Sequence, residues 1–143
     1  MEFTRADFKG MLQKNGLKAT NQRLVILEIL AKNKTHPSAY MIRDMLNDMG
    51  ISMSFATVYN TLESLYECGL IAKVKDENEL MRFDFETAFH IHIHDQETYD
   101  ITDYHDEKFC TMIEKYIRQN VLQKEDIASI ELNIKLKKHA IME

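Results

Sequence analysis

The sequence predicts an α+β protein in two parts, because the period of its apolar residues changes along the chain. Up to about residue 68 these residues recur at helical spacing. Beyond it, the alternation typical of strands dominates, interrupted by one amphipathic helix. The four glycines and the single proline all precede residue 70. We therefore expect two domains, residues 1–85 and 86–143.

Composition and charge narrow the class of protein. The 143 residues are 45% hydrophobic and 29% charged, as in a soluble globular protein. Neither a membrane span nor an apolar signal segment is evident, so we expect a cytoplasmic protein that contacts no membrane. The net charge of −5 lies in residues 86–143, whereas residues 1–85 are balanced. A polyanion would therefore meet the first half, although the low isoelectric point argues against indiscriminate nucleic-acid binding.

Four helices are expected in the first half. The first covers about residues 5–15, and the second begins after Thr20, a good N-cap residue. The third follows residues 36–37 and carries Met41 on its apolar face. The fourth follows residues 52–54 and runs to about residue 68.

The fourth helix has one apolar and one polar face. The expected core positions are Val58, Leu62 and Leu65, and the polar positions are Thr57, Asn60, Thr61 and Ser64. Two short strands follow, about residues 71–75 and 79–85, joined by a turn-like cluster. Short helices followed by a β-hairpin predict a winged helix-turn-helix domain, in which one helix enters the major groove of DNA.

The second half predicts a small α/β unit. Strands are expected at about residues 89–94 and 99–104, then a helix at 106–122 and an alternating strand at 129–137. A unit of this size buries little surface alone, so we expect its apolar faces to pair with a second copy. A homodimer also suits a DNA-binding protein that reads two half-sites.

Three histidines alternate with two isoleucines in residues 90–94. In an extended strand His90 and His92 share one face, roughly 6.6 Å apart, so both imidazoles can reach one metal ion. The alternative is an ordinary half-buried strand whose polar face carries histidine.

Other potential ligands lie elsewhere in the chain. Asp84 falls near the domain junction, Asp103 lies on the strand expected beside His92, and His36 precedes a helix. The set His36, Asp84, His90, His92 and Asp103 offers three nitrogens and two carboxylates, which suits Fe(II) or Mn(II) better than structural zinc. Alternatively, Asp84 pairs with Arg82, and His36 and Asp103 are ordinary loop and surface residues.

Several motifs resemble the ferric uptake regulator superfamily, in order along nearly the whole chain. They are Lys18-Ala19-Thr20-Asn21-Gln22-Arg23, His36-Pro37-Ser38-Ala39, Ser54-Phe55-Ala56-Thr57-Val58-Tyr59-Asn60-Thr61-Leu62, Gly69-Leu70-Ile71, Arg82-Phe83-Asp84-Phe85 and His90-Ile91-His92. The aspartate at position 84 is most similar to the peroxide-sensing branch. The resemblance implies a metal-dependent, homodimeric repressor that binds a palindromic, A/T-rich double-stranded DNA operator.

The resemblance also implies roles for individual residues. The five residues named above would form one regulatory Fe(II) or Mn(II) site per subunit, and peroxide would oxidise His36 or His90. DNA contacts are expected from Arg23, Ser54, Thr57, Tyr59 and Asn60.

One departure from the family pattern is large. The family's structural zinc is held by two Cys-x-x-Cys pairs, but Asp95 and Thr98 stand in place of the first pair. The only cysteines, Cys68 and Cys110, are expected to be small buried residues. We therefore expect no structural zinc. We expect the remaining histidines to be surface residues: His94, His105 and His139. The alternative is a second, weaker metal site that uses His94 or His105 with Asp95 or Glu97.

The function predicted from these observations is repression that hydrogen peroxide relieves through metal-catalysed histidine oxidation. One alternative is an iron-, manganese- or zinc-uptake regulator of the same fold. Another is a non-haem metalloenzyme, since two histidines and a carboxylate can hold catalytic iron. A DNA-binding domain has no role in such an enzyme, so we expect a protein that is not an enzyme.

Overall fold

The computed structural model describes residues 2–122, 127 and 129–138. It contains helices and small sheets in two compact units, residues 1–87 and 88–143, and confirms the predicted α+β class. Among the described residues, no helix combines the length and the apolar character that a membrane span requires.

The first unit contains four helices, each of which begins where its sequence supplies a cap. They are α1 (Arg5–Lys14), α2 (Asn21–Lys32), α3 (Ala39–Asp48) and α4 (Phe55–Glu67). The N-cap hydroxyls of Thr4, Thr20, Ser38 and Ser54 each accept a hydrogen bond from the backbone N–H three residues later. Gly16 and Gly50 follow helices with φ of 76°, a conformation that favours glycine.

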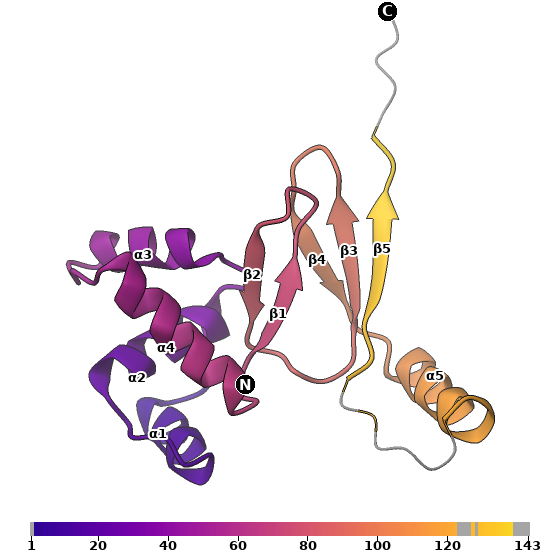
Figure 1. Cartoon of the computed structure of the whole chain (residues 1–143), viewed down its shortest axis with the longest axis horizontal. Helices are drawn as coiled ribbons and strands as arrows, with labels where there is room; N and C mark the ends of the chain where they lie inside the picture. The colour runs from indigo at the N-terminus through magenta and orange to yellow at the C-terminus, as the bar shows by residue number, and fades with distance from the viewer. Residues whose placement is uncertain (1, 123–126, 128, 139–143) are drawn as a thin grey trace, which may run out of the picture. The chain divides into compact units, whose positions relative to one another are not determined.

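The core of the first unit forms where α2 packs against α1 and α4 (Figure 1). Ile26, Leu27 and Leu62 are completely buried there. Two expectations about individual side chains are wrong. Met41 is 36% exposed, and Thr61 is buried, because its hydroxyl donates a hydrogen bond to the Thr57 carbonyl at 2.7 Å and so needs no solvent.

The expected hairpin consists of β1 (Ala72–Lys75) and β2 (Met81–Asp84), which pair antiparallel. Strand β2 also contacts the loop before α3, because the Phe83 N–H donates to the Pro37 carbonyl at 3.0 Å. An isolated bridge between Ser38 and Arg82 strengthens this connection. The hairpin therefore holds the residue 36–38 loop beside the end of β2.

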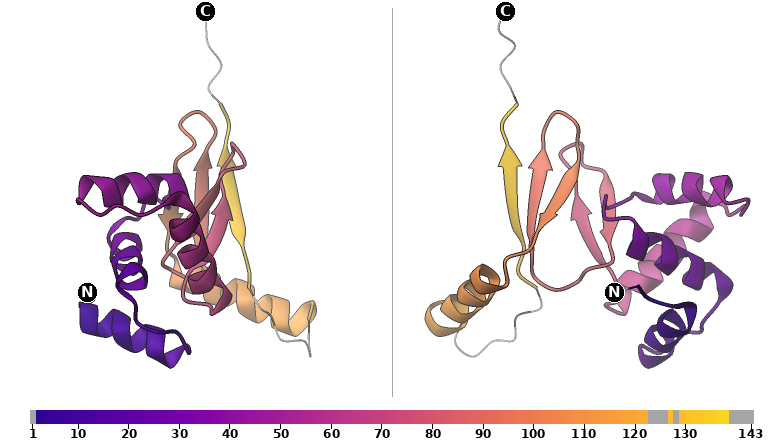
Figure 2. Two further views of the ribbon diagram at one scale, coloured as in Figure 1. Left: turned by 60° about the vertical axis from the view of Figure 1, so that its left-hand side comes forward. Right: turned by 180° about the vertical axis from the view of Figure 1, so that it is seen from behind.

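The second unit is a three-stranded sheet with one helix. The strands are β3 (Ile91–Asp95), β4 (Ile101–Tyr104) and β5 (Leu132–Leu136), and the helix is α5 (Glu107–Asn120). Strand β3 is central; it pairs antiparallel with β4 and parallel with β5. Figure 2 shows α5 near the end of the sheet where β3 begins, so the helix leaves much of the sheet uncovered.

Candidate metal centre

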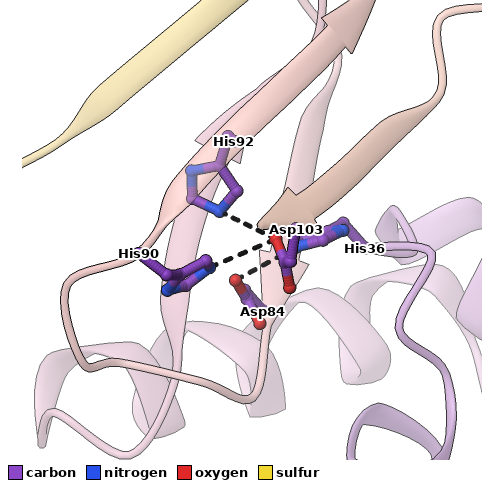
Figure 3. Close-up of side chains that lie close together, drawn as sticks. All are labelled: His36, Asp84, His90, His92 and Asp103. Atoms are coloured by element: carbon purple, nitrogen blue, oxygen red, sulfur yellow. Dashed lines mark hydrogen bonds and ion pairs between the residues drawn. The ribbon is translucent and has the colours of Figure 1, made fainter. Parts of the chain in front are cut away.

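His36 and Asp84 form a buried pair within the first unit. The His36 Nε2 atom lies 3.1 Å from Asp84 Oδ2, and the two residues are only 1% and 8% exposed (Figure 3). His36 has φ of 56°, an uncommon backbone conformation for a residue other than glycine. Its carbonyl accepts a hydrogen bond from Arg82 Nη1 at 3.1 Å. The surrounding structure thus specifies where this imidazole points.

Arg82 is positioned by a second buried carboxylate. Its Nε donates to Asp76 Oδ2 at 2.8 Å, and both residues are 6% exposed. Burial favours a higher pKa for Asp76, but hydrogen bonds from Arg82 and from the Leu80 and Asn78 N–H groups outweigh it and lower the pKa. Asp76 is therefore ionised and holds the Arg82 guanidinium in place. The sequence showed Asp76 only as part of a turn-like cluster and did not indicate this role.

The strand end that carries Asp84 is anchored by aromatic packing. Phe85 makes edge-on contacts with Phe3 and Phe8, at ring-centroid distances of 5.4 and 6.0 Å. Asp84 Oδ1 also accepts a hydrogen bond from the Glu86 N–H at 2.9 Å. Both interactions restrict the motion of the carboxylate relative to the rest of the first unit.

His90, His92 and Asp103 come together within the second unit. The antiparallel register places His92 directly opposite Asp103. Asp103 Oδ1 lies 3.2 Å from His90 Nε2 and 3.5 Å from His92 Nε2 (Figure 3). The register therefore brings His92 to Asp103, and His90, which directly precedes β3, directs its imidazole to the same carboxylate.

The tautomer of His90 suits a metal ligand. Its Nδ1 atom lies 2.7 Å from the Ala88 carbonyl, which can only accept a hydrogen bond, so Nδ1 carries the proton. In a neutral ring the lone pair is then on Nε2, the nitrogen that faces Asp103. A backbone carbonyl bonded to the distal nitrogen is the usual support of a metal-binding histidine.

The other histidines lie in different environments. His94 is buried, and its Nε2 lies 2.7 Å from Asn133 Oδ1 on β5, so the expected surface position is wrong: the parallel pairing of β3 and β5 covers this side chain. His105 is exposed, with its ring 5.2 Å from that of His90. His139 lies outside the described residues.

The positions that stand in place of the first cysteine pair lie at the turn after β3. There Asp95 Oδ1 accepts a hydrogen bond from the Thr98 N–H at 3.1 Å. Cys110 is buried, as expected, whereas Cys68 is half-buried, and both are free thiols. The absence of structural zinc stays a prediction.

The donor chemistry of the five predicted ligands fits a divalent metal ion. Each residue offers one nitrogen or carboxylate oxygen, and the mixture of imidazole and carboxylate suits Fe(II) or Mn(II). Buried charges need a compensating partner, which a cation can supply to a carboxylate. The first unit thus holds one candidate half-site, His36–Asp84, and the second holds the other, His90–His92–Asp103.

Four of the five residues expected to contact DNA lie on α4 or cap it, and Arg23 lies on α2. Thr57, Tyr59 and Asn60 are exposed on α4, and Ser54 caps it. Arg23 Nη1 donates to the Lys18 carbonyl at 2.8 Å. The sequence interpretation missed the rings beside Tyr59: Tyr40 stacks on Phe55, and Phe55 on Tyr59. The spacing of four residues between Phe55 and Tyr59 was the available signal.

The fold of this chain is also found in known proteins. The solved structure of a ferric uptake regulator from Pseudomonas aeruginosa with manganese has a TM-score of 0.78, with 22% identity, over 93% of this chain and 98% of that one. Residues 14–139 match the ferric uptake regulator family, and the chain belongs to that family.

Two relatives that are similar in sequence to this chain are named as two different kinds of regulator. The peroxide-responsive repressor PerR of Staphylococcus saprophyticus is 34% identical over 66% of this chain and 64% of its own length. The ferric uptake regulation protein of Brucella abortus is 31% identical over 81% of this chain and 83% of its own length. The chain thus spans under two thirds of the Staphylococcus relative.

Proposed function

We propose that this chain is a metal-dependent, homodimeric transcriptional repressor that binds a palindromic, A/T-rich double-stranded DNA operator. The observation that carries the proposal is the pair of preorganised half-sites, one in each compact unit, separated by the few residues between Asp84 and His90. One Fe(II) or Mn(II) ion per subunit would complete its coordination only from both half-sites.

This division of ligands suggests a conformational switch. A metal ion that needs both half-sites favours one arrangement of the two units over all others. Shifting a two-state equilibrium from 1:99 to 99:1 takes about 5.5 kcal/mol of differential affinity, which a site with five protein ligands can supply. The favoured arrangement sets the separation of the two α4 helices in a dimer, and hence the operator spacing that the dimer reads.

Dimer formation is supported by the exposed apolar side chains of the second unit. Met112 and Tyr116 on α5 are 57% and 62% exposed, and Ile134 and Leu136 on β5 are 44% and 46% exposed. A second copy would bury the same surfaces by two-fold symmetry.

The proposal includes a response to hydrogen peroxide. The Staphylococcus relative, which is named a peroxide-responsive repressor, supports this part. When held by these residues, Fe(II) would activate hydrogen peroxide beside the imidazoles with no net change in its own oxidation state, because the oxidised ring supplies both electrons that reduce the peroxide. His36 or His90 then gains one oxygen atom as 2-oxo-histidine, and the other oxygen of the peroxide leaves as water. The altered ring is a poorer donor, so metal and DNA are released. A manganese form would not respond to peroxide.

Anaerobic Fe(II)-loaded protein, treated with hydrogen peroxide and digested, tests the peroxide step. We expect the mass of one added oxygen atom on the peptide of His36 or His90, and no such gain in the Mn(II) form. The peptide of His139, which is not one of the predicted ligands, is the internal control. If neither His36 nor His90 gains oxygen, the chain does not sense peroxide by histidine oxidation.

The metal switch is tested by DNA binding. We expect Mn(II)-loaded protein to bind an A/T-rich palindromic duplex, and both a chelator and His36→Ala to abolish binding. Thr102→Ala, an exposed neighbour of Asp103, is the matched control and should bind as wild type. Equal DNA affinity with and without metal would contradict the switch.

A regulator of metal uptake is the second candidate, favoured by the Brucella relative named a ferric uptake regulation protein. Release of repressed genes by withdrawal of one metal, with no response to peroxide, would identify it. Family membership favours either regulator over a metalloenzyme.

A further inference from the structure

Three aromatic side chains form a continuous stack on the surface of the first unit. Tyr40, the second residue of α3, lies nearly parallel to Phe55 at a centroid distance of 4.4 Å and an interplanar angle of 20°. Phe55 in turn stacks on Tyr59 at 6.1 Å and 28°. The stack thus joins the start of α3 to the exposed face of α4.

The two ends of the stack are exposed while its middle is anchored. Tyr40 and Tyr59 are 52% and 42% exposed, whereas Phe55 is half-buried and packs against the hydrophobic core. Phe55 and Tyr59 are separated by one helical turn on the same face of α4. Core packing therefore holds Phe55, and Phe55 restrains both tyrosine rings.

The surroundings of the stack contain a cation, Arg43, which also lies 3.8 Å from Asp44 Oδ1, and polar side chains that suit a base-containing partner. The Arg43 guanidinium lies 6.0 Å from the centre of the Tyr40 ring, which places a cation at the outer end of the stack. Exposed Thr57 and Asn60 lie beside Tyr59 on α4. Apolar ring edges read thymine methyl groups in the major groove, and a guanidinium beside them pairs with phosphate.

We propose that Tyr40 and Phe55 are positioning residues for DNA reading, which hold the Tyr59 ring for contact with thymine methyl groups and extend the DNA-binding surface from α4 onto α3. The inference rests on the proposed DNA-binding function. An exposed tyrosine that is free to rotate loses conformational entropy when it is ordered by a ligand. A ring that is already stacked loses less, so the stack increases affinity for the DNA sequence that Tyr59 contacts.

The test uses a duplex selected from a random-sequence pool by the Mn(II)-loaded full chain. Its affinity is compared with that of the same duplex in which each thymine of a half-site is replaced by uracil, which removes only the methyl group. We expect Tyr40→Ala and Phe55→Leu to weaken binding of the thymine duplex about threefold to tenfold. Both variants should discriminate less between thymine and uracil.

Three controls separate positioning from other effects. Tyr40→Phe keeps the stacked ring and should bind as wild type. Tyr66→Ala removes a tyrosine of the same 42% exposure from the far end of α4 and should also bind as wild type. Affinity for a random duplex, and its salt dependence, should not change in the Tyr40 and Phe55 variants, since they remove no charge.

The effects of Tyr40→Ala and Tyr59→Ala should be non-additive, because one stack contains both rings. Additive effects, or equal losses with thymine and uracil duplexes, would overturn the inference while leaving the repressor proposal intact. If the wild-type chain selects no duplex at all, both the repressor proposal and the inference about the aromatic stack fail. Binding that is independent of metal would contradict only the switch.

Discussion

The two units of the chain differ in how much of their apolar surface they bury by themselves. In the first unit, all four helices and the hairpin contribute to one core, in which Leu12, Ile42 and Leu65 are fully buried. In the second unit, α5 buries only Cys110, and β5 leaves Ile134 and Leu136 exposed. The difference indicates that the first unit is stabilised internally, and the exposed surface of the second is the one that the proposed dimer would bury.

The two candidate half-sites also differ in the interactions that hold their side chains in place. In the first unit, backbone contacts, the Asp76–Arg82 pair and an aromatic cluster hold His36 and Asp84. In the second unit, the pairing of β3 with β4 places His92 opposite Asp103. The first half-site thus depends on tertiary packing, and the second on strand register.

The largest loss of stability is expected from Asp76→Asn. Removing this carboxylate leaves Arg82 with an uncompensated buried charge, which costs about 3–5 kcal/mol of the free energy of unfolding. Urea unfolding at pH 7 measures it, and His36→Ala, which leaves the Asp76–Arg82 pair in place, should cost less. A loss below that of His36→Ala would contradict the anchoring role of Asp76.

The same variant tests a pH dependence. The pKa of Asp76 is lowered in the folded chain, so its contribution is complete above the unfolded pKa of about 4 and is lost as pH falls through the lower folded value. The difference in unfolding free energy between wild type and Asp76→Asn should therefore shrink in acid. If this difference in unfolding free energy stays constant down to pH values well below about 4, ionisation of Asp76 does not stabilise the fold.

A smaller loss, about 2–5 kcal/mol, is expected from Leu62→Ala, because the side chain is fully buried and its removal leaves a cavity. Leu136→Ala is the matched substitution in the second unit, at a position 46% exposed. At concentrations where the chain is monomeric, it should cost less than about 1 kcal/mol. Equal losses in urea unfolding would remove the contrast between the units.

Within the second unit, Asn133→Ala should cost about 1–3 kcal/mol, since buried His94 loses its partner on β5. Hydrogen exchange of β5 amides should accelerate more than that of β4 amides. Asn120→Ala, at the exposed end of α5, is the control. Unchanged exchange in β5 would show that β5 does not depend on this bond.

The smallest effect, about 1.4 kcal/mol or tenfold in the dimer dissociation constant, is expected from Tyr116→Lys. The substitution places two like charges in a symmetric interface. Sedimentation measures the constant, and circular dichroism checks that helix content is retained. Tyr66→Lys, on the first unit, should leave the dimer unchanged; an equal shift would place the interface elsewhere.

Local sequence determined most of the elements. Helices begin directly after Thr20, Ser38 and Ser54, because the side-chain hydroxyls of these residues cap free N–H groups of the first turn, an interaction within a few residues. Strand alternation likewise predicted that His90 and His92 share one face, although His90 lies directly before β3. Side-chain burial was less predictable, since Met41, Thr61 and His94 depend on which neighbours cover them.

By itself, the sequence determined the class of fold, the donor types and the α4 face expected to meet DNA, because periodicity, capping and residue chemistry are local. Only the tertiary structure decided that Asp76 holds Arg82, that Arg82 holds the His36 backbone, and that Tyr40 stacks on Phe55. These contacts join residues from 6 to 46 positions apart, and burial determines their strength. Periodicity carries no information about such separations, so packing alone could reveal them.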